Sequence, residues 1–465
     1  MTGLLATELA GGRLPVGPRR AVAITTVLGA MALAVVDAGM VNVALPGLAQ
    51  AFGVSPARAI LVVTAYQAGM VMALLPLGAL GERYGHRRVF AFSVTVFATA
   101  STAAAFAPGL PWLIAARVLQ GLGGAGIMAL GMALLRFTVS KGHLGRAIGW
   151  NALNVALTSA AAPALGALVL AATDWRGLFL STLPVAVMVL AGTRALPATP
   201  RSDTPVDAAS AGLNALAFAL VILGAQAVTT APWAGLACLA SGGLAFLLLL
   251  RREAPRSNPM FPLDLLRGRS FRLSVLASTC CFAAQSAGLL AMPFLLQHQL
   301  HQAALTAGFY ITVWPLSVAA AALVAGRLSD RLSTAWLCGL GGAALSAGLA
   351  GAGFWIDVTR PATLVPCLML AGIGFGLFQS PNNRNMFLSA PAGRSGAAGG
   401  MQGAARVTGQ TLGALAVALF FSLRSLDTAM KCSLGLAALL ALCAGIVSLW
   451  RSTAVRHGGA ENEGA

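Results

Sequence analysis

The stretch that decides the fold is GALGERYGHRR, residues 78–88, which combines three glycines, an acidic residue and a group of arginines. A shorter form, GRLSDR at residues 326–331, follows 248 positions later and keeps the order Gly-x-Leu-x-acid-Arg. A second motif, GLGGA at residues 121–125, recurs 251 positions later as GIGFG at residues 372–376. Two unrelated motifs with nearly the same offset indicate that the chain contains an internal duplication.

Composition places this duplication in a membrane. Charged residues make up only 9% of the chain, against about 25% in soluble domains, and hydrophobic residues make up 58%, with a mean hydropathy of +0.81. The net charge of +17 does not indicate nucleic-acid binding, because the basic residues alternate with hydrophobic runs instead of gathering in one domain. The sequence therefore predicts an all-α integral membrane protein with the lipid bilayer as its surroundings.

Hydrophobic runs of about 20 residues, the length of a membrane-spanning helix, predict fourteen transmembrane helices. The runs are 21–45, 57–81, 88–108, 112–136, 146–171, 176–196, 207–227, 231–250, 271–297, 303–326, 333–356, 361–382, 398–422 and 429–450.

The distribution of basic residues tests this count and predicts the orientation. With both termini in the cytoplasm, most of the 30 Lys and Arg residues fall at the inner ends of helices or in inner loops. The exceptions at the outer side are Arg58, Arg176, Arg360, Arg424 and Lys431, and Arg117 and Arg406 lie within helices. We expect a multi-pass protein of a bacterial inner membrane.

The repeat offset, at roughly 30 residues per helix and loop, corresponds to eight helices. Two six-helix halves separated by two inserted helices explain it. The predicted division is 1–200 for the first six-helix bundle, 201–250 for the inserted helices, 251–270 for a cytoplasmic loop, 271–450 for the second bundle and 451–465 for a cytoplasmic tail.

In these motifs the sequence resembles the major facilitator superfamily, specifically its fourteen-span drug:proton antiporter branch. Residues 78–88 match the superfamily's loop between helices two and three. Residues 37–46 match the first-helix motif of the branch, and residues 117–121 match its fourth-helix motif. The resemblance covers nearly the whole chain, including residues 175–184 and 381–409. It implies the major facilitator fold and the export of drugs or small lipophilic or metabolite compounds by proton antiport.

The fifth helix departs from the branch. The usual Gly-Pro-x-x-Gly-Gly is replaced by APALGA at residues 162–167, which keeps only Pro163 and Gly166. We expect these two residues to bend the helix. The departure keeps open an alternative, a proton-coupled uptake symporter with the same fold.

Asp37 is the one acidic residue predicted to lie deep inside a helix, where an ionisable group is a functional candidate by default. Counting the helical rise of 1.5 Å per residue from each helix start, Arg117 lies at a depth compatible with Asp37. We predict that the two residues couple transport to protons. The alternative is a static ion pair that holds helices one and four together.

The 78–88 loop has a different expected role. By resemblance, Gly78, Glu82, Arg83, Gly85, Arg87 and Arg88 form a conformational latch that holds the two halves together on the cytoplasmic side in the outward-facing state. For the arginines, the alternative is that they serve only the charge asymmetry of the membrane topology.

A substrate cavity is expected near the middle of the membrane, lined by a few polar and aromatic side chains. The candidates are Gln67, Gln120, Asn154, Gln285, Tyr310 and Trp314, each of which has the alternative of bonding to a neighbouring helix. No second carboxylate is predicted there to attract a dication. We therefore expect a neutral, lipophilic or weakly charged substrate.

Other functional classes find less support in the sequence. The glycines in residues 121–126 lie inside a membrane helix and not after a strand, so they are not a dinucleotide motif, and neither Lys141 nor Lys431 sits in a phosphate-binding loop. Scattered histidines and carboxylates predict no metal site and no enzyme. We expect no cofactor, with the proton gradient as the energy source, and a monomer with a periplasmic adaptor as an optional partner. A non-transporting sensor remains the third alternative.

Overall fold

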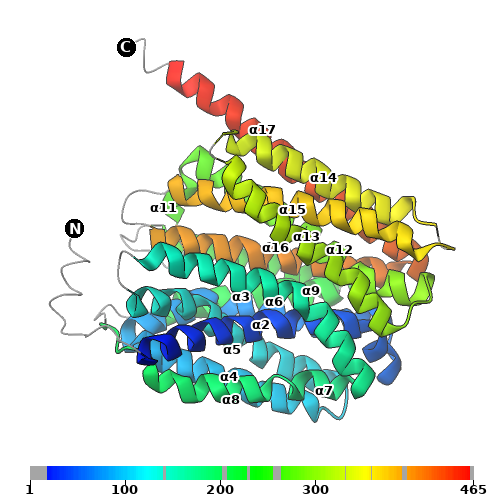
Figure 1. The fold of residues 1–465 in the computed structure, drawn as a ribbon, viewed down its shortest axis with the longest axis horizontal. Coiled ribbons are helices and arrows are strands. Elements are labelled where there is room, and N and C mark those ends of the chain that lie inside the picture. Colours follow the sequence, from blue (N-terminus) through cyan, green and yellow to red (C-terminus); the bar gives the residue numbers. More distant parts are fainter. Residues whose placement is uncertain are drawn as a thin grey trace.

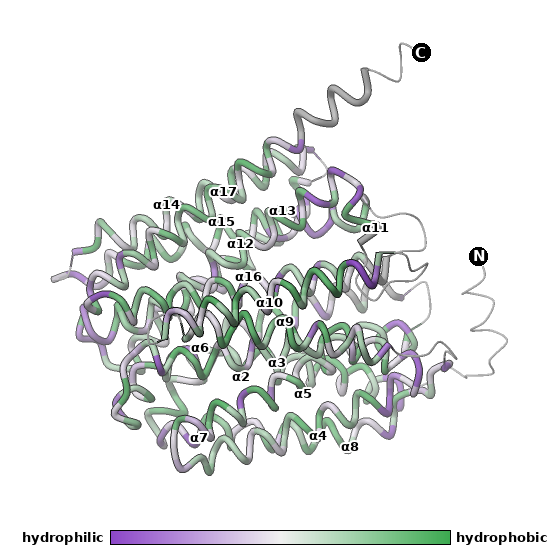
Figure 2. The backbone as a smooth tube through the Cα atoms, turned by 180° about the vertical axis from the view of Figure 1, so that it is seen from behind, coloured by the Kyte–Doolittle hydropathy of each residue, from purple (hydrophilic) through white to green (hydrophobic). Residues whose placement is uncertain are grey.

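The structure is a computed structural model, and it describes residues 18–139, 143–201, 207–227, 231–254, 263–329, 331–357, 359–389 and 395–460. These residues form helices and connecting loops, with no strand among them. Thirteen helical segments are long and apolar enough to span a membrane, and α9 supplies a shorter apolar helix, Ala208–Gly224. Figure 2 shows hydrophobic residues along the length of the bundle and hydrophilic residues towards its two ends. The predicted all-α membrane fold is confirmed.

The helices follow the predicted runs. The first half consists of α2 (Pro18–Ala51), α3 (Pro56–Tyr84), α4 (His86–Ala105), α5 (Leu110–Thr138), α6 (Leu144–Ala172), α7 (Trp175–Leu180), α8 (Leu183–Gly192) and η2 (Thr193–Ala195). The inserted helices are α9 (Ala208–Ala227) and α10 (Pro232–Glu253), followed by the short α11 (Leu263–Leu266). The second half consists of α12 (Arg269–Phe294), η3 (Leu295–Gln299), α13 (Ala304–Leu328), α14 (Thr334–Phe354), η4 (Pro361–Thr363), α15 (Leu364–Leu388), α16 (Ser395–Leu423) and α17 (Leu426–Ala460).

The two halves repeat in register. The first residue of α13 lies 248 positions after the first residue of α3, and the first residue of α14 lies 248 positions after that of α4. Moved by 251 positions, α6 coincides with α16 at both ends. The packing repeats as well, because α5 contacts α3 and α4 in the first half, and α15 contacts α13 and α14 in the second.

Small residues hold these contacts close. A Cβ added to Gly121 of α5 would lie 2.1 Å from the Tyr66 carbonyl oxygen of α3, and one on Gly372 of α15 would lie 2.4 Å from the Trp314 oxygen of α13. Tyr66 and Trp314 are themselves 248 positions apart. The repeated glycine motif therefore marks the same interhelical contact in both halves, as expected where helices pack without a hydrophobic driving force between them.

The sixth predicted span is not one continuous helix. It is divided between α7 and α8 at Ser181 and Thr182. Pro184 lacks an N–H and its ring crowds the carbonyl four residues earlier, which breaks the helix there. The two hydroxyls bond to carbonyls of the preceding turn, with Ser181 donating to Leu178 at 2.8 Å and Thr182 donating to Phe179 at 2.7 Å. At the other end of the chain α17 continues to Ala460, so the predicted tail begins as helix.

We call the end of the bundle where α2 begins and α17 ends the near face, and the opposite end the far face (Figure 1). The two halves contact each other mainly through α6 with α13 and α3 with α16. The largest cluster of buried apolar side chains joins the second half to the far part of the first, including Leu45, Ile60 and Phe294. The near part of the first half has its own cluster, and Val407 is the only buried second-half residue described in it. Apolar packing between the halves is therefore concentrated towards the far face.

The inserted helix α9 is docked on α3 through a buried amide. Asn214 donates from Nδ2 to the Met72 carbonyl oxygen at 2.9 Å. This carbonyl lies four residues before Pro76, whose missing N–H leaves it without its helical donor. Asn214 thus supplies the hydrogen bond that the proline removes, and α9 also contacts α16 of the second half.

Replacing Asn214 by Leu should lower stability by about 1 kcal/mol, the net cost of one lost buried hydrogen bond. The measurement is the midpoint of thermal unfolding in detergent. Pro76→Ala restores the backbone donor, so the same Asn214 substitution made in that background should cost less. Equal costs in both backgrounds would show that Asn214 does not replace the donor missing at Pro76.

Candidate functional site

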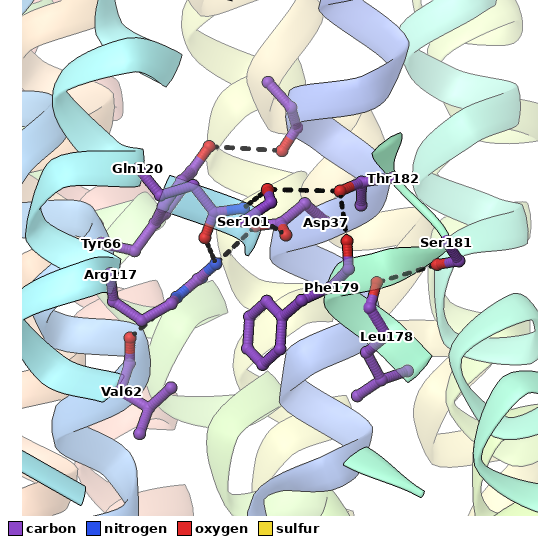
Figure 3. Close-up of polar contacts among 11 residues, drawn as sticks. Asp37, Val62, Tyr66, Ser101, Arg117, Gln120, Leu178, Phe179, Ser181 and Thr182 are labelled. Carbon is purple, nitrogen blue, oxygen red and sulfur yellow. Dashed lines mark hydrogen bonds and ion pairs between the residues drawn. The ribbon is translucent and has the colours of Figure 1, made fainter. Parts of the chain in front are cut away.

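The predicted pair of Asp37 and Arg117 is formed, and a third side chain completes it. Arg117 Nη1 lies 2.6 Å from Asp37 Oδ2, and Gln120 Nε2 donates to Asp37 Oδ1 at 2.9 Å. Arg117 also donates to Gln120 Oε1 at 2.5 Å. All three side chains are buried. Both carboxylate oxygens of Asp37 are thus occupied by donors from α5 (Figure 3).

Further groups surround this triad. Gln120 donates to the Ser101 hydroxyl of α4 at 2.7 Å, and the Ser101 and Thr182 hydroxyl oxygens lie 3.2 Å apart, within hydrogen-bond distance. Arg117 Nε donates to the Val62 carbonyl at 3.2 Å, while its guanidinium carbon lies 4.3 Å from the centre of the Tyr66 ring. A cation over an aromatic face is stabilised without a second charge. The network joins α2, α3, α4 and α5 to the junction between α7 and α8 (Figure 3).

Local sequence sets this geometry. Arg117 and Gln120 are three residues apart on α5, so they lie on one face of the helix. Gly121 allows α5 to approach α3 at Tyr66. Arg117 lies four residues before Gly121 on α5, and Val62 lies four residues before Tyr66 on α3. The Arg117–Val62 hydrogen bond is therefore one helical turn from the glycine contact. The close glycine contact therefore determines how deeply the guanidinium reaches towards α2.

The triad carries no net charge while Asp37 is ionised. Protonation of Asp37 would leave the Arg117 guanidinium uncompensated inside the protein, a state that costs several kcal/mol. Arg117 Nη2 already has no hydrogen-bond partner among the described residues. Gain or loss of one proton at Asp37 would thus change the interactions that join α2 to α5.

The predicted latch residues lie at the near face, where α3 meets α4. Gly85 has φ 96°, a left-handed conformation that suits glycine and turns the chain between the helices. Within the described part of the chain, Glu82, Arg83, Arg87 and Arg88 form no ion pair with the second half. A Cβ on Gly78 would meet no atom within 4 Å. Asp330 of the repeated motif lies outside the described residues.

The predicted cavity residues are not gathered in one place. Gln120 belongs to the Asp37 network and is fully buried, and Asn154 donates to the Leu28 carbonyl at 2.9 Å, joining α6 to α2. Trp314 is buried within the second half against Gly288 and Gly372. Gln120 and Asn154 thus make hydrogen bonds to neighbouring helices, the alternative expected for them, whereas the buried Trp314 Nε1 has no hydrogen-bond partner among the described residues.

The other three cavity candidates are partly exposed. They are Gln67, Gln285 and Tyr310. The Gln67 Oε1 atom is buried and has no hydrogen-bond partner among the described residues. These residues remain cavity candidates by position.

Pro163 and Gly166 lie on an uninterrupted α6. A Cβ on Gly166 would lie 2.8 Å from Met40 Cα of α2, and the Pro163 carbonyl oxygen lies 2.8 Å from a Cβ built on Gly308 of α13. Gly166 thus lies where α6 packs against α2 of the first half, and Pro163 lies where α6 packs against α13 of the second half. The predicted bend stays a prediction.

Ser101, Thr182 and Tyr66 were not predicted as site residues, although each contacts or supports the triad. Arg406, on α16, has a buried Nε with no hydrogen-bond partner among the described residues. A signal for Gln120 was present in the sequence, because it follows Arg117 by three positions on the same helix.

Comparison with known proteins gives consistent matches along the chain. The sequence profile of the Major Facilitator Superfamily matches residues 27–414 and 274–464. The uncharacterized transporter YebQ of Escherichia coli (strain K12) is 37% identical over 452 residues, which cover 94% of this chain and 97% of YebQ. The drug efflux pump JefA of Mycobacterium tuberculosis (strain ATCC 25618 / H37Rv) is 29% identical over 387 residues, 81% of this chain and 76% of JefA. A crystal structure of a peptide transporter, POT, has a TM-score of 0.74 at 16% identity and covers 97% of this chain and 98% of its own.

Proposed function

Because this chain belongs to the major facilitator superfamily, we propose that it is a proton-coupled secondary transporter that exports small organic molecules across a bacterial inner membrane. The protein alternates between states open to either side, and entry of a proton from outside drives the exit of the substrate. The membrane-spanning helices and the relatives support a transporter. Proton coupling, direction and substrate class are the proposed parts.

One observation carries the proton coupling, namely the burial of Asp37 against Arg117 and Gln120. Asp37 is the only carboxylate in the middle of a described membrane span. A carboxylate in such a position is costly and marks ion pathways and proton relays in transporters. The ionised carboxylate is held by hydrogen bonds from Arg117 and Gln120. Protonation of Asp37 releases both side chains and thereby loosens α2 from α5.

Two features support export. The relative JefA is a drug efflux pump, and residues 37–46 and 117–121 carry the motifs of the drug:proton antiporter branch. The packing of the halves towards the far face fits the state in which the near face is open, as does the lack of an ion pair between residues 78–88 and any described residue of the second half. The arginines at the near face predict that this face is cytoplasmic.

An uptake symporter is the second candidate. The observation that favours it is the fifth helix, where Ala162 and Ala167 replace two glycines of the antiporter motif. The two directions make opposite predictions in the same preparation, so one experiment separates them.

The test uses inverted membrane vesicles from a strain that lacks its own efflux pumps, with ethidium, Hoechst 33342 and other dyes as probes. With an acidic vesicle interior, an exporter accumulates dye inside, and dissipating the proton gradient releases it. Loss of preloaded dye driven by the same gradient would instead show symport. Absence of gradient-dependent flux for every compound in a broad panel would overturn the proposal in favour of a sensor.

A further inference from the structure

A cavity of about 350 Å³ opens at the near face within the first half. It lies between the α3–α4 junction and the segment that follows η2. The residues that line it are Tyr84, Gly85, Arg87, Arg88, Ala198, Thr199 and Arg201. Three of these seven residues are arginines and none is acidic.

The walls of the cavity are fixed by hydrogen bonds. The His86 backbone N–H donates to Thr199 Oγ1 at 2.9 Å, and the His86 ring Nδ1 lies 3.2 Å from the same oxygen. This ties the segment around Thr199 to the start of α4. Arg201 follows two residues later, and its Nε lies 3.9 Å from a Cβ built on Gly85. Arg201 is thus brought to the same turn that carries Arg87 and Arg88.

The charge of the cavity has no counterpart in the described structure. None of Arg87, Arg88 and Arg201 forms an ion pair with a described carboxylate. The first turn of α4 adds the positive end of a 20-residue helix. Three arginine residues line one small cavity, and arginine side chains offer the paired hydrogen-bond donors that a phosphate accepts.

We propose that this cavity binds a phosphate group, supplied by the headgroup of an anionic lipid in the leaflet at the near face. The cavity is large enough for a phosphate with its glycerol, since ligand sites begin at about 300 Å³. Its position at the polar end of the helices places it at headgroup depth, and Tyr84 also lines it.

Occupation of the cavity has a consequence for conformational change, which rests on the proposed function. Arg87 and Arg88 are predicted latch residues, and a bound phosphate engages the same guanidinium groups. The lipid would therefore compete with pairing across the two halves and favour the state in which the near face is open.

The binding test uses the purified full-length protein in detergent, titrated with dioctanoyl phosphatidylglycerol, dioctanoyl phosphatidylcholine and inorganic phosphate. Native mass spectrometry counts the bound lipid, and microscale thermophoresis gives the affinity. Combined substitution R87Q, R88Q and R201Q should weaken phosphatidylglycerol binding at least about tenfold. A matched control, R19Q, R20Q and R136Q, removes the same charge at the same face outside the cavity and should leave the affinity unchanged.

Each result has one meaning. Tight phosphatidylglycerol binding that depends on the cavity arginines supports the lipid, whereas equal, arginine-dependent binding of inorganic phosphate supports the phosphate site and assigns it a soluble ligand. Equal affinities for wild type, cavity variant and control would overturn the proposal. Should the triple variant fail to fold, R201Q alone, with R201K as a partial rescue, gives the same comparison. These assays measure binding without transport, so they can fail or succeed independently of the proposed function.

Discussion

Asp37→Asn should abolish transport driven by a pH gradient while leaving exchange of substrate across the membrane without a gradient. Asparagine keeps the size and one acceptor oxygen of the carboxylate but exchanges no proton. The measurement is the initial rate of dye accumulation in inverted vesicles with an acidic interior, which should fall by more than about tenfold, a loss of over ~1.4 kcal/mol of coupling. Asp174→Asn is the matched control, because it changes an exposed aspartate whose ion pair to Arg176 is also exposed.

The same substitution also tests the alternative of a static ion pair. Asp37→Asn leaves Arg117 charged and buried, at a cost of about 3–5 kcal/mol, so its unfolding midpoint should fall. Adding Arg117→Gln removes that charge and should restore part of the stability. If the pair is only structural, gradient-driven transport returns together with stability in the double variant. If Asp37 carries the proton, stability returns and gradient-driven transport does not.

Gly374→Ala should severely reduce the amount of folded protein. A Cβ at this position would lie 2.2 Å from the Leu345 backbone nitrogen and 2.6 Å from the Gly341 carbonyl oxygen, so α15 and α14 must separate. Because backbone atoms and not flexible side chains block the methyl group, we expect a cost at or above the upper end of overpacking, about 3 kcal/mol. The measurement is the monodisperse fraction after detergent extraction, followed by the unfolding midpoint.

The duplication supplies a matched pair for this experiment. Gly123→Ala makes the equivalent change between α5 and α4, where a Cβ would lie 2.6 Å from the Phe97 nitrogen, and should be similarly damaging. Gly243→Ala on α10 meets no atom within 4 Å and should be neutral or slightly stabilising. Equal yields and midpoints for Gly374→Ala and Gly243→Ala would contradict the close helix contact.

The sequence predicted the helices well because each span needs a long hydrophobic run with charges at its ends, a requirement that the bilayer imposes residue by residue. It located the divided sixth span poorly. Pro184 was visible, but proline is tolerated in many membrane helices, among them α3 at Pro76 and α6 at Pro163. Whether a proline divides a helix depends on which neighbours satisfy the freed carbonyls.

The candidate site was predicted in part. Asp37 and Arg117 stand out because buried charges are rare and must be paired. Ser101 does not stand out, because a hydroxyl in a helix can bond either within its own helix or to a neighbouring helix, and the sequence does not distinguish the two. Ser101 accepts a hydrogen bond from Gln120 across helices, whereas its neighbour Thr102 donates to the Ala98 carbonyl of its own helix. Gln120 was assigned to a cavity for the same reason, because depth in the membrane does not reveal which neighbour a helix face meets.

The register shared by the two halves also has a consequence for the electrical balance of the transport cycle. The positions 248 and 251 residues after Asp37 are Gln285 and Gly288 on α12, so neither offset of the repeat places a second carboxylate there. Under the proposed coupling through Asp37 alone, each turnover exchanges one proton. Export of a neutral compound then moves one net charge and gains about 2.3 kcal/mol for every 100 mV of membrane potential. Export of a monovalent cation is electrically silent and responds to the pH difference alone.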